Sequence, residues 1–211
     1  LAGGSRGLAA AADVPLVAGL RGDREIVVVD TGTGTPHGPF QAHTAGVQAL
    51  ALSVDLRSAS ALEPALAATR AALAPLGGLV HSAGTVDTAG LEGITPESWD
   101  AGMNLHLRAL ALLTQALLPD LKASPGSAIV TIASINATLG NAINPIYTAA
   151  KGGMLALVRS LADRLGHDGV RINAVSPGVI VTPMTRPSME AVGREWYEKR
   201  VLLGRMGEPE E

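Results

Sequence analysis

The chain has no cysteine among its 211 residues. Disulfides, thiolate zinc sites and cysteine nucleophiles are therefore excluded. Aromatic side chains are also scarce, at 2% of the residues, although the hydrophobic fraction of 47% and the charged fraction of 17% are those of a globular chain. The core must then be built mainly from small aliphatic side chains, which favours closely packed helices and sheets over an aromatic-rich sandwich.

Clustered positive charge and long apolar runs are missing as well. The formal net charge is −3, and no basic cluster offers a contact surface to nucleic acid or to an anionic membrane. The apolar runs are shorter than a bilayer span and are interrupted by charges. No signal-peptide pattern opens the chain. We therefore expect a cytoplasmic protein with no nucleic-acid partner and no membrane partner.

The histidines offer no metal-binding pattern. His37 and His43 lie in a polar loop rich in proline and glycine, without the carboxylates that would complete a metal site. His106 and His167 have the sequence context of helix-surface or helix-end residues. We expect no metal ion in this protein.

Short apolar runs alternate with longer helical patterns, which is typical of a parallel α/β fold. Strands are predicted at Glu25–Asp30, Val47–Asp55, Gly78–Ser82, Ser127–Ala133 and Val170–Val175. Helices are predicted at Ala59–Ala74, Pro96–Ala116, Tyr147–Leu165 and Ser188–Val201. The prediction is a Rossmann-type, doubly wound parallel sheet in three layers, formed by a single dinucleotide-binding catalytic domain over residues 1–211. In such a sheet ligands bind beyond the carboxyl ends of the strands.

Both ends of the chain differ from a whole domain of this kind. A glycine-rich turn at Gly3–Gly7 should follow a strand, but only Leu1 and Ala2 precede it. The other end stops at Glu208–Glu211, where a further helix should begin. We expect a fragment of a longer chain, with a sheet that lacks its first and last strands and so exposes two inner edges.

The segment Ala9–Gly22 does not suit one continuous helix, because Pro15 would break its interior. Either a helix begins near Asp13, with Pro15 in its first turn, or residues are missing at this point.

The segment Gly3-Gly4-Ser5-Arg6-Gly7-Leu8-Ala9 has glycines spaced so that a backbone turn can approach a pyrophosphate at a helix N-terminus. An ordinary loop is an equally good interpretation of this turn alone. Asp30, however, ends the Ile-Val-Val-Val run that follows. A carboxylate there can accept hydrogen bonds from the adenosine ribose hydroxyls and repels a 2′-phosphate. The two features together favour dinucleotide binding.

A second group of residues is Ser134, Tyr147 and Lys151. Ser134 follows a predicted strand at the ligand-bearing edge, and Tyr147 opens a predicted helix on which Lys151 lies one turn later, on the same face. A free tyrosine has a pKa of about 10, and a nearby cation lowers it enough for proton exchange with an alcohol. The alternative interpretation is a half-buried core tyrosine beside a solvated lysine.

The ordered set of motifs resembles the classical branch of the short-chain dehydrogenase/reductase family over essentially the whole chain. The matching segments are Gly3–Gly7, Asp55, His81-Ser82-Ala83-Gly84, Asn104, Ser134, Tyr147-Thr-Ala-Ala-Lys151, Asn173-Ala-Val-Ser-Pro-Gly178 and Leu203–Glu210. Two positions depart from the family pattern. Ala9 replaces the last glycine of the phosphate turn, and His81-Ser82 replaces a pair of asparagines that normally fixes neighbouring strands. Because histidine can still donate a hydrogen bond, we expect this part to be weakened and not lost.

The resemblance implies a role for each matching residue. Tyr147 would be the catalytic acid/base, Ser134 would polarise the substrate, and Lys151 would bind the nicotinamide ribose and lower the pKa of the tyrosine. Asn104 would help to hold a proton-relay water. Asp55 would contact the adenine, Ala83–Gly84 the adenosine ribose, and Pro177–Thr182 the nicotinamide amide. The full set implied to bind the cofactor is Gly3, Ser5, Arg6, Gly7, Leu8, Asp30, Asp55, Leu56, Ser82, Ala83, Gly84, Tyr147, Lys151, Pro177, Gly178, Ile180 and Thr182.

The resemblance thus implies an NAD(P)(H)-dependent oxidoreductase that transfers a hydride between nicotinamide and a secondary alcohol or ketone. Asp30 favours NAD(H) over NADP(H), although Arg6 resembles the basic residue of NADP-preferring relatives. The alternative function is that of a catalytically silent dinucleotide-binding homologue. A hydrolase that uses Ser134 is a third possibility, but no Gly-x-Ser-x-Gly elbow surrounds this serine.

The resemblance also implies a homotetramer or homodimer built on the helices predicted at Pro96–Ala116 and Tyr147–Leu165. Gly152-Gly153 in the second of these helices indicates a close approach, either by a partner subunit or by a neighbouring element. Trp196 belongs either to a substrate lid or to an amphipathic helix that it anchors. The candidates for substrate contact are Ile135, Asn141, Ile143 and Trp196.

Overall fold

The computed structural model describes residues 16–21, 25–30, 48–73 and 76–211. The backbone falls into two compact units, Val14–Ser176 and a second one that contains Pro177–Glu211. The single domain expected over the whole chain stays a prediction. None of the helices among the described residues is long and apolar enough to cross a membrane.

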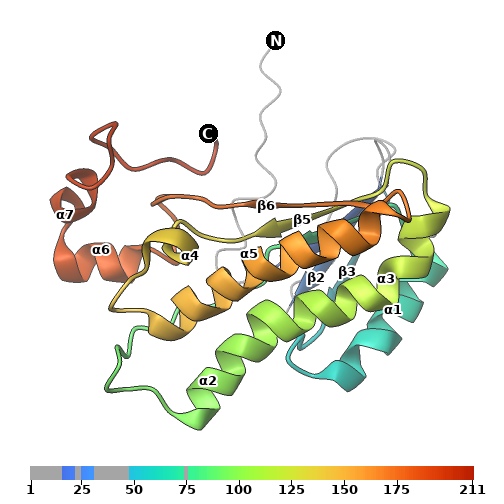
Figure 1. Cartoon of the computed structure of the whole chain (residues 1–211), viewed down its shortest axis with the longest axis horizontal. Coiled ribbons are helices and arrows are strands. Elements are labelled where there is room, and N and C mark those ends of the chain that lie inside the picture. Colours follow the sequence, from blue (N-terminus) through green and yellow to red (C-terminus); the bar gives the residue numbers. More distant parts are fainter. Residues whose placement is uncertain (1–15, 22–24, 31–47, 74–75) are drawn as a thin grey trace. The chain divides into compact units, whose positions relative to one another are not determined.

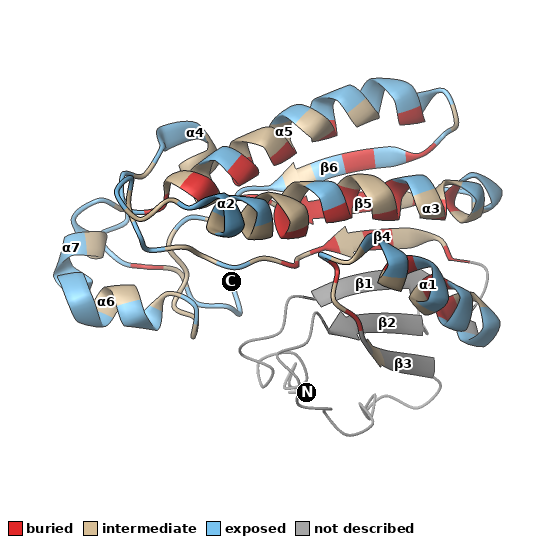
Figure 2. Cartoon of the chain, turned by 90° about the horizontal axis from the view of Figure 1, so that it is seen from below, coloured by how far each residue is buried: buried red, intermediate tan, exposed pale blue. Residues whose placement is uncertain are grey.

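The first unit is built on a six-stranded sheet with the order β3-β2-β1-β4-β5-β6 (Figure 2). All five strands expected from the sequence are present, with ends that shift by one or two residues. The pairs β2–β3, β4–β5 and β5–β6 are parallel, as predicted. The bounds are β1 Leu16–Arg21, β2 Glu25–Asp30, β3 Gln48–Ser53, β4 Gly78–His81, β5 Ala128–Ile132 and β6 Arg171–Val175.

The strand β1 corrects two expectations. A helix beginning near Asp13 was one of two interpretations of this segment, but Leu16–Arg21 is a strand that pairs with β2 and β4, antiparallel to both. The sheet is therefore parallel except at its centre, and the two inner edges expected to be exposed pair with β1 instead. The physical reason is the cost of unpaired backbone groups at these edges, which outweighs any local helical preference of the segment.

Three long helical segments pack on the sheet of this unit. Helix α1 spans Ala59–Leu73 and α5 spans Pro145–Gly166. The helix expected over Pro96–Ala116 is a composite of α2 (Pro96–Met103), a π-helical turn η1 (Asn104–Arg108) and α3 (Ala109–Ala123). Its start follows from the sequence, because Thr95 and Ser98 cap it reciprocally and Pro96 occupies the first turn. The short helix α4 spans Asn136–Leu139.

The core lies between the sheet and these helices, which cover the same face of it (Figures 1 and 2). Leu79, Ile129 and Ile172 come from neighbouring strands in register, are at most 5% exposed, and share one hydrophobic cluster with α1, α3 and α5. On the other face of β6, Arg171, Asn173 and Val175 are exposed. The second helix layer of the expected three-layer arrangement is not among the described residues.

A glycine explains how closely α5 approaches η1. A Cβ atom on Gly153 would lie 2.6 Å from Cδ1 of Leu107, closer than side-chain atoms pack. A Cβ atom on Gly152 would have ordinary contact with the carbonyl oxygen of Ala137, at 3.6 Å. Local packing within the chain therefore explains Gly153, whereas no close contact in the described residues requires a glycine at position 152.

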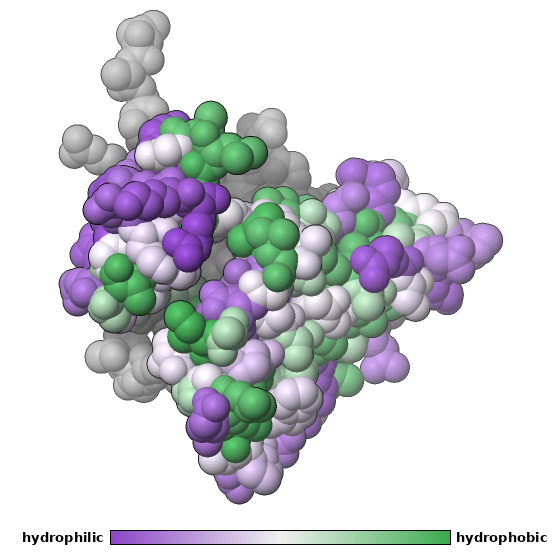
Figure 3. All heavy atoms as spheres, turned by 60° about the vertical axis from the view of Figure 1, so that its left-hand side comes forward, coloured by the Kyte–Doolittle hydropathy of each residue, from purple (hydrophilic) through white to green (hydrophobic). Residues whose placement is uncertain are grey.

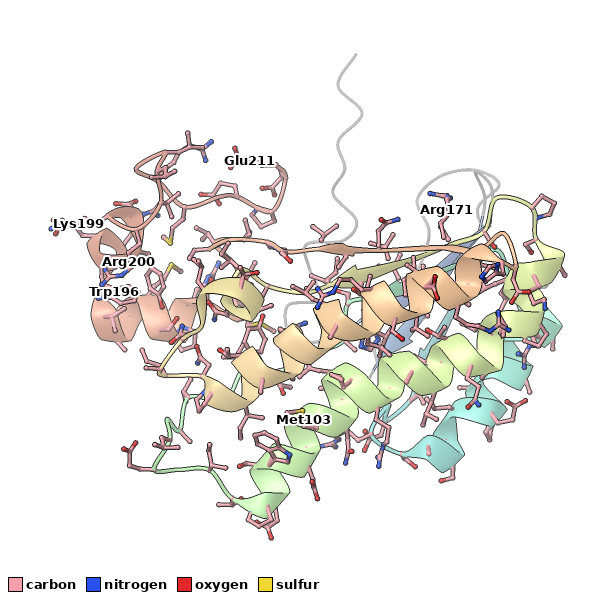
Figure 4. All side chains as sticks on the ribbon, viewed as in Figure 1. Met103, Arg171, Trp196, Lys199, Arg200 and Glu211 are labelled. Carbon is pink, nitrogen blue, oxygen red and sulfur yellow. The ribbon has the colours of Figure 1, made fainter. Side chains whose placement is uncertain are left out.

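The second unit contains two short helices in place of the one expected over Ser188–Val201. Helix α6 spans Arg186–Val192 and α7 spans Arg194–Glu198. Gly193 separates them with a φ of 86°, a left-handed conformation that favours glycine and interrupts the helix. Trp196 lies beside Arg200 (Figure 4), whose guanidinium carbon is 3.6 Å from the centroid of the indole ring.

An ion pair joins α1 to α3. Arg70 donates to the carboxylate of Asp120 at 2.9 Å and to the carbonyl oxygen of Ala116 at 2.7 Å. We expect Arg70→Met to lower the free energy of unfolding by about 1–3 kcal/mol, because Asp120 then stays half-buried without its partner. The control Glu63→Gln removes an exposed partner of the same arginine and should change stability by less than about 0.5 kcal/mol. Urea unfolding measures both, and equal effects of the two variants would contradict the assignment.

Candidate active site

Ser134, Tyr147 and Lys151 converge at the carboxyl end of β5. Ser134 follows this strand and is 8% exposed. Tyr147 is the third residue of α5, and Lys151, only 4% exposed, lies one turn later. The Nζ atom of Lys151 is 5.5 Å from the centroid of the Tyr147 ring and donates to the carbonyl oxygen of Ile132 at 2.5 Å. The arrangement places a phenol, a hydroxyl and an ammonium group together at the edge where parallel α/β sheets bind ligands.

The electrostatics of this group differ from the expectation that Lys151 lowers the pKa of Tyr147. In the structure, burial raises the pKa of Tyr147, and a hydrogen bond from Ser134 is the influence that lowers it. Burial also lowers the pKa of Lys151, to about 8. The physical reason is that desolvation disfavours the charged form of either group.

Two buried histidines border the same site, and one of them, His106, was predicted to lie on a helix surface or at a helix end. That assignment is wrong, because His106 is 1% exposed and His81 is 0% exposed. The Nε2 atom of His81 lies 3.2 Å from the carbonyl oxygen of His106, which can only accept. His81 therefore donates a hydrogen bond, as expected for its position. A signal for His106 was present, since it shares a helical stripe with Leu110, Leu113 and Leu117, all buried.

Burial, with a further contribution from the charge of Lys151, lowers the pKa of His81 to about 4 and that of His106 to about 3. Both imidazoles are therefore neutral near pH 7. The Nε2 atom of His106 donates to the carbonyl oxygen of Thr85 at 2.9 Å. Its Nδ1 atom is buried and has no hydrogen-bond partner among the described residues.

Asn104 begins the π-helical turn η1. Its carbonyl oxygen accepts the backbone N–H of Ala109, which lies five residues further along the chain. Such turns interrupt the regular pattern of helical hydrogen bonds and are frequent at functional sites. The role of Asn104 in holding a water stays a prediction.

The residues expected to bind the adenosine part of a cofactor are described only in part. Arg57 binds both carboxylate oxygens of Asp55, at 2.9 and 3.0 Å, and lowers the pKa of that carboxyl group. The side chain of Leu56 is 2% exposed and belongs to the core, so only its backbone is available to a ligand. Ser82 and Gly84 are partly exposed and Ala83 is fully buried, directly after β4.

Several predicted site residues are not placed at this site by the structure. Those that fall outside the described residues are Gly3, Ser5, Arg6, Gly7 and Leu8. The backbone of Asp30 is described at the end of β2, but its side chain is not. The residues of the second unit, which the structure describes but does not place against the first, are Pro177, Gly178, Ile180, Thr182 and Trp196.

The candidates for substrate contact in the first unit are exposed or half-buried. Ile135 is 38% exposed and Ile143 is 45% exposed, while the Oδ1 atom of Asn141 accepts the backbone N–H of Ile143. Leu139, 75% exposed, adds a further apolar side chain on α4. In Figure 3, hydrophobic side chains form separate groups among hydrophilic ones on the face turned toward the viewer.

The burial of Lys151 yields a prediction of pH dependence. Its pKa is about 8 in the folded chain against an ordinary value of 10.5. Between these two pH values the unfolded chain keeps a proton that the folded chain has released, so stability due to this group rises with pH. We expect Lys151→Met to be more stable than the wild type below pH 8, by on the order of 3 kcal/mol, and to lose this advantage as the pH rises to about 10.5.

Urea unfolding at a series of pH values measures this difference. Lys122→Met, which removes a lysine that is 48% exposed on α3, is the control for the loss of one positive charge. An advantage of Lys151→Met that does not change with pH would contradict the prediction.

Comparison with known proteins agrees with this geometry. The family described as enoyl-(acyl carrier protein) reductase matches residues 21–211. The chain is 36% identical over 158 residues to a protein named "Probable galactose dehydrogenase" from Rhizobium meliloti, covering 74% of this chain and 61% of that protein. It is 32% identical over 209 residues to the acetoacetyl-CoA reductase of Shinella zoogloeoides, covering 99% and 84%.

Among solved structures, the L-sorbose reductase of Gluconobacter frateurii, in complex with NADPH and L-sorbose, is similar with a TM-score of 0.72 and 26% identity. The similarity covers 78% of this chain and 67% of the reductase. The chain thus spans between 61% and 84% of the length of these relatives. On the match to nearly its whole length, the chain belongs to the short-chain dehydrogenase/reductase family of NAD(P)-dependent oxidoreductases.

Proposed function

We propose that this protein interconverts a secondary alcohol and a ketone, with Tyr147 as the general acid/base, Ser134 as the group that binds the substrate oxygen, and Lys151 as their electrostatic partner. The observation that carries this proposal is the convergence of the three side chains at the end of β5, two of them almost completely buried. The names of the relatives, which include a dehydrogenase and two reductases, support the same class of reaction.

The described residues fit a nicotinamide nucleotide in two respects. Lys151 has three N–H donors, of which the carbonyl oxygen of Ile132 accepts one, so donors remain for ribose hydroxyls. Gly84 is partly exposed in the segment that follows β4, at the edge of the sheet where nucleotides bind in such folds. When bound, the nicotinamide would supply the hydride acceptor or donor. The side chains of the site would bind the substrate oxygen and transfer the proton.

In the direction of oxidation, the phenol oxygen of Tyr147 would take the hydroxyl proton of the substrate. In the direction of reduction, it would return this proton to the carbonyl oxygen. The Ser134 hydroxyl, whose Oγ atom also accepts the backbone N–H of Asn136 at 3.2 Å, would hold the substrate oxygen within reach of the phenol. The ammonium group of Lys151 would stabilise the phenolate, which is the form of Tyr147 that takes up the proton in oxidation and that is left once the proton has been donated in reduction.

The substrate remains a secondary alcohol or ketone of unspecified structure in this proposal. The resemblance is to enzymes of the 3-oxoacyl reductase type and of the polyol or hydroxysteroid type. A homotetramer or homodimer and a cytoplasmic location also stay predictions.

The role of Tyr147 is tested by Tyr147→Phe. We expect kcat to fall by about 100-fold or more, because the proton has no other carrier, while the dissociation constant for NADH or NADPH changes little. Tyr197→Phe is the matched control, since it removes the only other phenol of the chain and should leave kcat unchanged. Steady-state reduction of a panel of ketones and fluorescence titration with the nucleotides provide the two measurements.

If the wild type binds nucleotide but reduces no ketone and oxidises no alcohol, the alternative of a catalytically silent homologue gains support. If Tyr147→Phe keeps wild-type turnover, the acid/base role is wrong.

The preference for NAD(H) over NADP(H) is proposed from Asp30, whose carboxylate would repel a 2′-phosphate. The L-sorbose reductase, which was solved in complex with NADPH, favours NADP(H) instead. We expect Asp30→Ala to narrow the ratio of the dissociation constants for NADPH and NADH by about tenfold, mainly through tighter NADPH binding. Asp23→Ala, which removes an acidic residue that precedes β2 in the sequence, is the control for the loss of one negative charge. Unchanged affinities for both nucleotides in Asp30→Ala would remove this residue from the cofactor site.

A further inference from the structure

We propose that His106 is a positioning residue for Tyr147, with its imidazole ring forming one wall of the site that holds the phenol and His81 bracing the turn that carries it. The inference rests on the proposed function for its catalytic consequence, and on the contacts of the described residues for its geometry. The sequence motifs gave His81 a role in fixing neighbouring strands and gave His106 none.

The first observation is the contact between the two rings. The centroids of His106 and Tyr147 are 5.6 Å apart and their planes are inclined by 82°, an edge-to-face arrangement. Because α5 carries Tyr147 and η1 carries His106, this contact fixes the position of the phenol relative to a different helix from its own. The side chain of Tyr147 can then rotate less freely than its place near the start of α5 would otherwise allow.

The second observation is that the imidazole ring of His106 is itself held on several sides. Its Nε2–H donates to the carbonyl oxygen of Thr85 at 2.9 Å, in the segment after β4. A Cβ atom on Gly84 would lie only 2.5 Å from Cε1 of His106, so this glycine leaves the space that the ring fills. His81 donates to the backbone carbonyl oxygen of His106 at 3.2 Å. The ring is thus tied to the segment after β4, and the backbone that carries it is tied to β4 itself.

The third observation concerns charge. The neutral state of both imidazoles, described above, lets them lie near the buried ammonium of Lys151 without adding positive charge to the site. A lysine or arginine at position 106 could supply packing but would repel Lys151. A neutral ring therefore suits this wall, and a phenylalanine should preserve its contact with Tyr147.

Three substitutions separate the ring from the hydrogen bond. His106→Phe keeps a ring and loses the donor to Thr85, His106→Gln keeps an N–H donor and loses the ring, and His106→Ala loses both. We expect His106→Phe to keep kcat within about threefold of wild type, and His106→Gln and His106→Ala to lower it about tenfold or more, with the KM for the ketone changed by less than about threefold. A purely structural role of the hydrogen bond predicts the reverse order of Phe and Gln.

Leu117→Ala is the control for a general loss of stability. Leu117 is 4% exposed and lies on the same buried stripe as His106, about three helical turns further along, in α3. It should lower the thermal midpoint at least as much as His106→Ala while keeping kcat near the wild-type value. If Leu117→Ala lowers kcat to the same extent, or if His106→Phe is as slow as His106→Ala, the proposal is wrong.

A second measurement needs neither nucleotide nor substrate, and so separates this proposal from the proposed function. The chain has two tyrosines, and in a Tyr197→Phe background the absorbance of the tyrosinate reports Tyr147 alone. Burial raises the pKa of Tyr147. Loss of the ring in His106→Ala should admit water and move the midpoint toward about 10, whereas His106→Phe should keep the wild-type midpoint. Identical midpoints in all three proteins would overturn the proposal even if the enzyme proves active, and the expected order would support it even if no substrate is found.

Discussion

The ammonium group of Lys151 lies inside the α/β unit with the carbonyl oxygen of Ile132 2.5 Å from its Nζ atom. Burying a charged group is costly, and the pKa of about 8 reflects that cost. Burial also keeps the groups around it neutral. The pKa values of His81 and His106 fall to about 4 and about 3, and burial raises that of the Tyr147 phenol. Burial thus sets the protonation states in the site, and the charge of this buried cation adds to the effect at the two histidines.

Close packing of helices determines where that cation lies. Helix α5 presents Gly153 to Leu107 of η1, and a Cβ atom on Gly102 of α2 would lie 2.6 Å from Cγ2 of Ile146 at the start of α5. Small residues on both sides of this contact let the backbones approach, at the cost in helix propensity that glycine brings. The same turn η1 carries Asn104 and His106. The glycines that weaken the helices locally therefore allow residues from α5 and η1 to meet.

Much of this arrangement could be predicted from the sequence. The apolar runs that became β4, β5 and β6 and the spacing of Tyr147 and Lys151 on α5 follow from local patterns. The strand β1 could not be predicted, because its pairing with β2 and β4 is a long-range effect that its own residues do not encode. The π-helical turn η1 also has no local signature, since it inserts one residue into a pattern that reads as a continuous helix. The burial of His106 was encoded in its spacing to Leu110 and Leu113, but a polar side chain at one end of an apolar stripe is easily assigned to the surface.

The pairing of Asp55 with Arg57 affects whether the Asp55 carboxylate can accept a hydrogen bond from a ligand. Both carboxylate oxygens of Asp55 accept hydrogen bonds from Arg57. If this ion pair were buried, a further strong donor could not reach the carboxylate. The two side chains are 43% and 51% exposed, however, and ion pairs at that exposure contribute only about 0–1 kcal/mol because water screens them and long side chains lose freedom in forming them. A carboxylate has about four lone-pair sites, so it can also accept from a ligand while it keeps part of the contact with arginine. The backbone N–H of Arg57, which donates to Oδ1 of Asp55 at 2.9 Å, holds the carboxylate in place whether or not the guanidinium stays. The ion pair therefore does not close Asp55 to a ligand, and the backbone N–H of Arg57 helps to hold the carboxylate in place just beyond the end of β3.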